Sequence, residues 1–163
     1  MGIYLNPKNK GFQEAVCSEI YVDKTELIAY TNKCLNTEEK YICVSRPRRF
    51  GKSMTLKMLA AYYSRGCDSK ELFAGYKIEN DETFHRYLNQ YDVIYLNMQQ
   101  FLLKAKKQNL TVYLEQAVIA DLKRLYSEYF PAQETNLASA LEQIYAETDR
   151  EFIFLIDEWD CVM

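Results

Sequence analysis

The sequence has little of several residue types on which common site chemistries depend. It contains a single histidine, His85, and its five cysteines form no C-x-x-C pair. We therefore expect neither a histidine-based metal site nor a Ser-His-Asp triad. A disulfide framework would need a shorter chain that is denser in cysteine. The remaining interpretation is reduced thiols at Cys17, Cys34, Cys43, Cys67 and Cys161.

Glycine and proline are also scarce, at five and three residues. This composition excludes collagen-like and proline-rich chains. No apolar run approaches the roughly 20 residues of a membrane span. Residues 1–12 are interpreted as a loop, and residues 1–10 lack the apolar core of a signal peptide. We therefore expect a cytoplasmic protein that has no membrane partner.

What the sequence does have is enough apolar material to form a core. It comprises 163 residues, of which 48% are hydrophobic and 26% are charged. That length corresponds to about one domain of roughly 150 residues. The net charge is −3, whereas proteins that hold nucleic acid by charge are normally basic. Direct binding of nucleic acid is therefore not expected.

Strand-like and helix-like apolar segments alternate along the chain. Short β-rich runs predict strands at 41–44, 93–96 and 152–156. Asp23 and Glu26 have the spacing of a capping box at the start of a first helix. Further helices are expected at 54–65, 81–89, 108–130 and 134–147. This alternation predicts an α/β fold with a parallel sheet covered on both faces.

A phosphate-binding loop is indicated within residues 41–65, where the first predicted strand meets its helix. Backbone N–H groups at a helix N-terminus and the helix dipole attract phosphate there. Gly51 lets the backbone approach closely, Lys52 can reach the β- and γ-phosphates, and Ser53 offers a hydroxyl to Mg²⁺. The match to G-x-x-x-x-G-K-[ST] is partial, because Arg46 stands where that pattern has its first glycine.

The last predicted strand, within residues 151–160, ends in a pair of acids. Asp157 stands where a Walker B aspartate holds Mg²⁺, and Glu158 where a glutamate polarises the attacking water. Many surface turns also follow a strand with two acids, so this motif alone is only moderately specific. Both motifs follow an apolar strand and come in the expected order. Together they predict a P-loop nucleotide site.

Three arginines form a basic cluster beside Gly51, at positions 46, 48 and 49. Three interpretations stay open for them. They contact the triphosphate or nearby carboxylates, they form a solvated loop, or they contact nucleic acid. We favour the first of these.

Residues 45–53, S-R-P-R-R-F-G-K-S, resemble the phosphate loop of the AAA-ATPase-like family of bacterial proteins. Members of that family carry R-P-R-R-F-G-K-S in place of a standard Walker A motif. Three other segments resemble motifs of the same family: Y-V-D-K-T at 21–25, E-L-F-A-G at 71–75 and I-D-E-W-D at 156–160. The resemblance covers residues 12–163, and its phosphate loop is highly specific.

The resemblance implies a three-layer P-loop NTPase fold of the ASCE or AAA type, with ATP and Mg²⁺ as cofactors. Carried over to this sequence, Lys52 binds phosphate and supports catalysis, and Glu158 activates water. Ser53 and Asp157 serve Mg²⁺. The implied nucleotide-binding residues are Pro47, Arg48, Arg49, Phe50, Gly51, Lys52, Ser53 and Met54. The resemblance implies that Asp23 and Lys24 of Y-V-D-K-T lie near the nucleotide, and it assigns them no role.

Longer relatives continue past the Walker B motif and often end in a domain that resembles PD-(D/E)xK nucleases. We therefore expect residues 1–163 to be the N-terminal part of one P-loop domain, cut after the Walker B strand. The implied function is ATP binding, with Mg²⁺-dependent hydrolysis in the full-length protein and weak or no turnover in this segment. The alternative is a nucleotide-gated regulatory module for an attached nuclease-like domain. A homo-oligomer is a further expectation, because related ATPases act as rings or use a neighbour's arginine.

Overall fold

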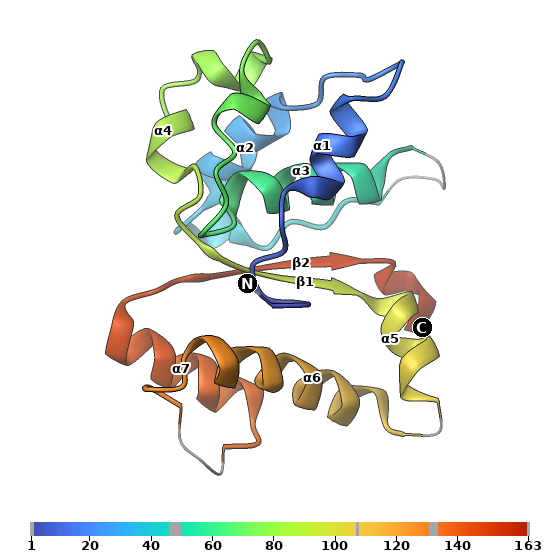
Figure 1. Cartoon of the computed structure of the whole chain (residues 1–163), viewed down its shortest axis with the longest axis vertical. Coiled ribbons are helices and arrows are strands. Elements are labelled where there is room, and N and C mark those ends of the chain that lie inside the picture. The colour runs from blue at the N-terminus through green and yellow to red at the C-terminus, as the bar shows by residue number, and fades with distance from the viewer. Residues whose placement is uncertain (1, 46–49, 107, 131–133, 163) are drawn as a thin grey trace. The chain divides into compact units, whose positions relative to one another are not determined.

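The computed structural model describes the chain at residues 2–45, 50–106, 108–130 and 134–162. The chain forms two compact units, which are considered separately (Figure 1). The sheet unit combines Met1–Pro7 with Tyr91–Met163, and the helical unit comprises Lys8–Gln90. The phosphate loop therefore belongs to the helical unit, and the acid pair after the last strand belongs to the sheet unit.

The sheet unit is built on two parallel strands, β1 (Asp92–Asn97) and β2 (Phe152–Asp157). Their register places Asn97 opposite Asp157. Between and after the strands the chain forms α5 (Met98–Ala105), α6 (Leu110–Leu125), α7 (Leu137–Thr148) and the 3₁₀-helix η4 (Trp159–Val162). Parallel neighbours need such a long connection, because the chain must return to the end of the sheet at which it started.

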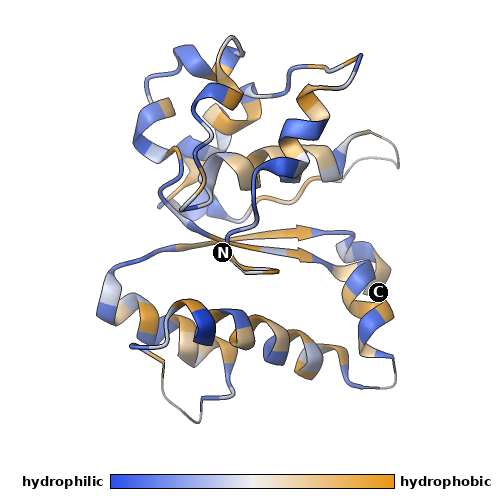
Figure 2. Ribbon diagram, in the orientation of Figure 1, coloured by the Kyte–Doolittle hydropathy of each residue, from blue (hydrophilic) through white to orange (hydrophobic). Residues whose placement is uncertain are grey.

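An apolar core lies between the strands and helices α6 and α7, which run along the same side of them (Figure 1). Ile94 and Leu96 of β1 are buried in it together with Leu122 of α6 and Ile144 of α7. Figure 2 shows both strands as strongly hydrophobic. Continuous apolar strands are typical of parallel sheets. The mixture of helices with a small parallel sheet agrees with the predicted α/β class.

The N-terminal segment is part of the sheet unit, and the interpretation of residues 1–12 as a loop is wrong at Leu5 and at residues 10–12, where helix α1 (Lys10–Val16) begins. Leu5 is fully buried and forms an antiparallel bridge with Ile94. The N–H of Tyr95 donates to the Tyr4 carbonyl at 2.8 Å. The carboxylate of Asp121 on α6 accepts hydrogen bonds from two N–H groups of the segment, those of Tyr4 at 2.6 Å and Leu5 at 3.2 Å. These contacts join the segment to both β1 and α6.

The helical unit has an aromatic core. Its elements are α1 (Lys10–Val16), α2 (Glu26–Cys34), η1 (Glu38–Lys40), α3 (Lys52–Tyr63), η2 (Glu71–Phe73), η3 (Lys77–Asn80) and α4 (Phe84–Tyr87). The ring of Tyr62 lies 5.6 Å from Phe73 and 5.8 Å from Phe84 between centroids. All three residues are buried. Aromatic pairs at such distances stabilise a core beyond the area that they bury.

The strand predicted at 41–44 does not form. Residues 41–45 have no regular secondary structure and are exposed, to 86% at Tyr41 and 48% at Val44. Within the described ranges, no backbone hydrogen bond from another segment reaches them. A β-rich composition produces a strand only where a neighbouring strand satisfies its N–H and C=O groups. Of the strand–loop–helix predicted at 41–65, the structure has the helix, and the three-layer sheet stays a prediction.

In the part of the chain that the structure describes, no helix has both the length and the apolar character needed to cross a membrane.

Candidate functional site

Gly51 is the residue at which the phosphate loop becomes helix α3. It is the N-cap, with φ +78° and ψ 23°. This left-handed conformation would cost any residue with a Cβ about 1–2 kcal/mol. The Gly51 carbonyl accepts hydrogen bonds from the N–H of Thr55 at 2.9 Å and from its hydroxyl at 3.0 Å. Lys52 and Ser53 follow in the first turn, whose N–H groups have no acceptor within a helix.

Five of the eight predicted nucleotide-binding residues are described by the structure. Phe50 is 61% exposed before the helix, and Met54 is 37% exposed in its first turn. Gly51, Lys52 and Ser53 lie between them and are half-buried. Outside the described residues are Pro47, Arg48 and Arg49, together with Arg46 of the basic cluster.

A second lysine reaches the phosphate loop from another segment. Lys24 Nζ donates a hydrogen bond to the Phe50 carbonyl at 3.0 Å. A Cβ atom at position 51 would lie 2.8 Å from the same nitrogen. Sequence reasoning noted the Y-V-D-K-T segment without a role for this lysine. The resemblance implies a place near the nucleotide for Lys24, and the folded chain shows its hydrogen bond to the loop.

The residues on either side of Lys24 fix its segment. Asp23 accepts hydrogen bonds from the N–H of Thr25 at 2.8 Å and from that of Lys77 at 3.1 Å. The hydroxyl of Thr25, which is fully buried, accepts from the N–H of Ile78 at 3.2 Å. The predicted capping box is therefore wrong, because Asp23 bonds two residues ahead, as in an Asx-turn. Partial burial by itself would raise the pKa of Asp23. The hydrogen bonds from Thr25 and Lys77 outweigh this effect and hold the pKa below its usual value.

Because its pKa is lowered, the carboxylate of Asp23 is predicted to make a contribution to the free energy of unfolding that depends on pH. Between the folded-state pKa and the usual value of 3.8, the unfolded chain binds more protons, so the free energy of unfolding rises with pH. The contribution is present above pH 3.8 and is lost as the pH falls through the folded-state pKa. Urea unfolding of wild type and Asp23→Asn between pH 7 and pH 3 measures it. Below about pH 4, we expect the free energy of unfolding to fall less in Asp23→Asn than in wild type. Identical pH profiles of the two proteins would contradict this assignment.

In the sheet unit, Asp157 is the last residue of β2, and each of its two carboxylate oxygens accepts a hydrogen bond. The residue is 2% exposed. One carboxylate oxygen accepts the N–H of Glu158 at 3.1 Å, and the other accepts the hydroxyl of Tyr95 at 3.2 Å. Glu158 has a φ of +54°, which is uncommon for a residue other than glycine. Backbone strain of this kind is concentrated at functional sites.

Tyr95 is a residue of this site that sequence reasoning missed. It lies on β1 opposite Leu155, and therefore on the sheet face that Asp157 shares. Burial raises the pKa of Tyr95, and the neighbouring charge and hydrogen bond of Asp157 raise it further. The hydroxyl consequently stays protonated and donates to Asp157. The register of the two strands brings these residues together, and no local motif predicts that register.

Each unit contains one of the two residues that the sequence assigns to Mg²⁺, Ser53 in the helical unit and Asp157 in the sheet unit. Mg²⁺ prefers oxygen ligands and is usually bound by one or two carboxylates, with water and substrate phosphates completing its shell. Asp157 and Ser53 supply a carboxylate and a hydroxyl of this kind. Among the described residues, no group of three or more His, Cys, Asp or Glu side chains could hold a metal ion by itself. By its own chemistry, each of these residues fits a cation whose remaining ligands are water and phosphate.

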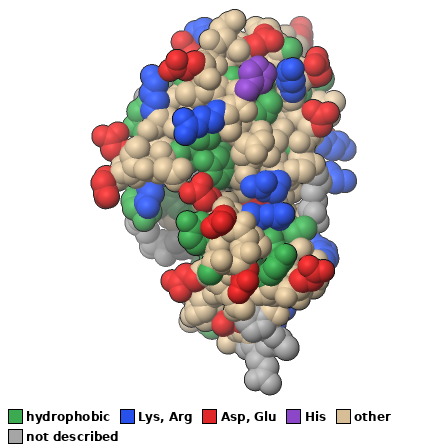
Figure 3. Space-filling model, turned by 90° about the vertical axis from the view of Figure 1, so that its left-hand side faces the viewer, with side chains coloured by type: hydrophobic (Ala, Val, Ile, Leu, Met, Phe, Trp, Pro, Cys, Tyr) green, Lys and Arg blue, Asp and Glu red, His purple; other side chains and the backbone are tan. Residues whose placement is uncertain are grey.

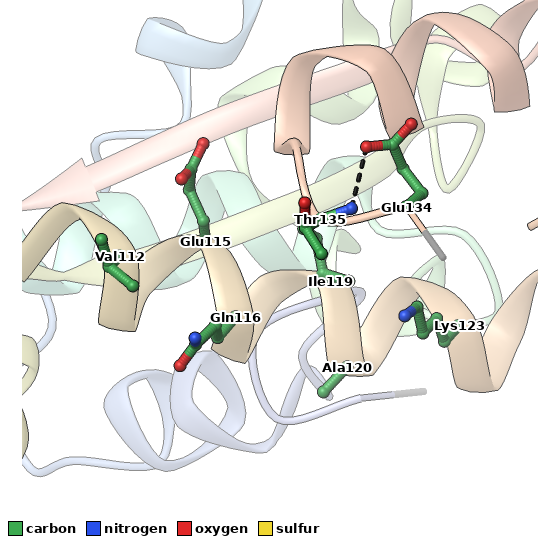
Figure 4. Close-up of a pocket in the computed structure, with 8 residues that line it drawn as sticks. All are labelled: Val112, Glu115, Gln116, Ile119, Ala120, Lys123, Glu134 and Thr135. Carbon is green, nitrogen blue, oxygen red and sulfur yellow. Dashed lines mark hydrogen bonds between the residues drawn. The ribbon is translucent and has the colours of Figure 1, made fainter. Parts of the chain in front are cut away.

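A separate hollow of about 420 Å³ lies along α6 in the sheet unit (Figure 4). Its lining residues are Val112, Glu115, Gln116, Ile119, Ala120, Lys123, Glu134 and Thr135. The N–H of Thr135 donates to the Glu134 carboxylate at 2.8 Å, which the dashed line in Figure 4 marks. None of the predicted site residues lines this hollow, so it is not part of the candidate site.

Described side chains of both signs of charge lie at the surface. The face shown in Figure 3 carries both basic and acidic described residues. Exposed ion pairs join Lys77 to Glu26 at 2.8 Å and Lys10 to Glu14 at 3.7 Å.

The sequence matches one protein family over most of its length. The match covers residues 12–163, and the family is described as "predicted AAA-ATPase". No curated protein and no solved structure matches the chain. The matched range includes Lys24, the phosphate loop and the acid pair, whereas the segment that contains Leu5 lies before it. The chain therefore belongs to the AAA-ATPase-like family.

Proposed function

We propose that this chain binds ATP together with Mg²⁺ through its phosphate loop, as the nucleotide-binding part of an ATPase. The observation that carries the proposal is the left-handed Gly51 at the N-terminus of α3, followed directly by Lys52 and Ser53. This arrangement combines backbone N–H donors, the positive end of a helix dipole and an ammonium group at one place. Membership of a family of predicted AAA-ATPases supports the same function.

The proposed site assigns a role to each predicted residue. Residues 47–54 surround the phosphates, and Lys52 binds the β- and γ-phosphate oxygens. Ser53 and Asp157 hold Mg²⁺, which when bound would neutralise charge that develops on the phosphate oxygens. Glu158 orients and polarises the attacking water. The Tyr95 hydroxyl and the Glu158 N–H orient the Asp157 carboxylate, as their hydrogen bonds indicate.

Substitution of Lys52 tests the proposal. We expect Lys52→Ala to bind a fluorescent ATP analogue, with Mg²⁺ present, about 10- to 100-fold more weakly than wild type, because a charge-assisted contact to phosphate is lost. The matched control is Lys57→Ala, which removes an exposed lysine from the same helix and should bind as wild type does. Circular dichroism checks that both variants are folded. Equal affinity of Lys52→Ala and wild type would overturn the proposed function.

A further inference from the structure

The ammonium group of Lys24 lies at the phosphate loop without a role in the site proposed above. We propose that Lys24 is a second phosphate-binding lysine, which contacts the phosphate chain of the nucleotide together with Lys52. The proposal rests on the proposed function and adds to the same site a residue from a segment outside the phosphate loop.

The first support is the position of the ammonium group. Its nitrogen lies 3.0 Å from the Phe50 carbonyl oxygen and would lie 2.8 Å from a Cβ at position 51. A lysine ammonium has three N–H donors, and the Phe50 carbonyl accepts one of them. Within the described ranges, the other two meet no acceptor and no carboxylate pairs with this lysine. The loop thus holds a cation with donors available to a ligand.

The second support is the way in which nearby acids are satisfied. Glu26 forms an ion pair with Lys77 at 2.8 Å, and this contact raises the pKa of Lys77. Asp23 accepts its hydrogen bonds from backbone N–H groups, including that of Lys77. Both acids beside Lys24 are therefore engaged elsewhere. Among the described residues, the ammonium group of Lys24 therefore contacts the phosphate loop and not a carboxylate.

The third support is the anchoring of the segment. Asp23 and Thr25, on either side of Lys24, are bonded to the backbone of Lys77 and Ile78. The Lys24 carbonyl accepts the N–H of Leu27 at 3.0 Å and so joins the start of α2. These bonds fix the backbone from which the lysine extends. A cation held in this way needs little reorganisation when an anion binds.

The experiment compares Lys24→Met, Lys24→Arg and a matched control, Lys33→Met, which changes an exposed lysine on α2. Affinity for the fluorescent ATP analogue is measured from low to high salt. We expect Lys24→Met to bind about tenfold more weakly at low salt. Its affinity should also depend less steeply on salt, because one charge contact is missing. Lys24→Arg keeps the charge and should stay within about threefold of wild type, and Lys33→Met should match wild type.

Two results would overturn the proposal. One is wild-type affinity in Lys24→Met. The other is an equal loss in Lys24→Met and Lys24→Arg with an unchanged salt dependence, which would show that Lys24 only supports the Phe50 carbonyl. Either result overturns this inference alone when Lys52→Ala still weakens binding. If Lys52→Ala binds as wild type does, the proposed function fails and this inference fails with it.

Discussion

Replacing Asp92 by alanine is expected to lower the free energy of unfolding of the sheet unit by about 2–5 kcal/mol. Asp92 begins β1 and is completely buried. Its carboxylate accepts hydrogen bonds from the side-chain amide of Asn6 and from the hydroxyl of Tyr126. Alanine would leave both buried donors without this acceptor, and each unsatisfied donor costs about 1–3 kcal/mol.

The network around Asp92 explains why this effect should be large. Burial raises the pKa of Tyr126 to about 12, and its hydrogen bond to Asp92 contributes in the same direction. Its hydroxyl therefore remains a donor at ordinary pH. Arg150 donates to the Tyr126 hydroxyl at 3.2 Å, and Asn6 also accepts the N–H of Val93 at 2.8 Å. One buried acid thus joins the N-terminal segment, β1, the end of α6 and the turn before β2.

Urea unfolding followed by circular dichroism and by the fluorescence of Trp159 measures this effect. The matched control is Glu142→Ala, which removes an exposed acid from α7 in the same unit. It should change the free energy of unfolding by less than about 0.5 kcal/mol. A loss in Asp92→Ala no larger than in this control would show that the buried network does not stabilise the sheet unit.

Elements with a strong local pattern were predictable from the sequence. β1, β2, α3 and α7 form within two or three residues of the expected ranges. The helix expected over 108–130 ends at Leu125, because the next residue, Tyr126, turns to the buried Asp92. Helix α5 was missed, although Asn97 provides a local indication: its side chain accepts the N–H of Gln100 at 3.0 Å, as an N-cap does.

Tertiary contacts limit what the sequence can predict about the candidate site. Gly51-Lys52-Ser53 stands at a helix start and Asp157-Glu158 at a strand end, as their spacing indicates. Tyr95 could not be found in this way, and Lys24 was expected near the nucleotide only from the family resemblance, without a contact. The hydrogen bond from Lys24 to Phe50 joins residues 26 positions apart in the sequence, and that from Tyr95 to Asp157 joins residues 62 positions apart. The strand predicted at 41–44 failed for a related reason, since pairing rather than composition decides whether a strand forms.

Replacing Asp157 by asparagine is the second prediction with a large expected effect. The variant keeps nearly the same shape but removes the negative charge that we assign to Mg²⁺ binding. In wild type, Mg²⁺ should strengthen the binding of ATP by about tenfold or more, because the cation joins phosphate to a protein carboxylate. In Asp157→Asn this strengthening should disappear. Binding of ATP without Mg²⁺ should persist in both proteins, because it depends on Lys52 and the start of α3.

Asp160→Asn is the matched control for this substitution. Asp160 is an exposed acid three residues after Asp157 in the same motif. It has no role in the proposed site, so its loss should leave the effect of Mg²⁺ unchanged. Thermal unfolding of the three proteins shows whether a difference in binding reflects a difference in folding.

The dissociation constant of ATP with excess Mg²⁺ and with EDTA, in wild type and Asp157→Asn, tests most directly whether both motifs serve one nucleotide site. Our account predicts that Mg²⁺ strengthens binding in wild type and in Asp160→Asn, and has no effect in Asp157→Asn. An equal effect of Mg²⁺ in wild type and Asp157→Asn would contradict it.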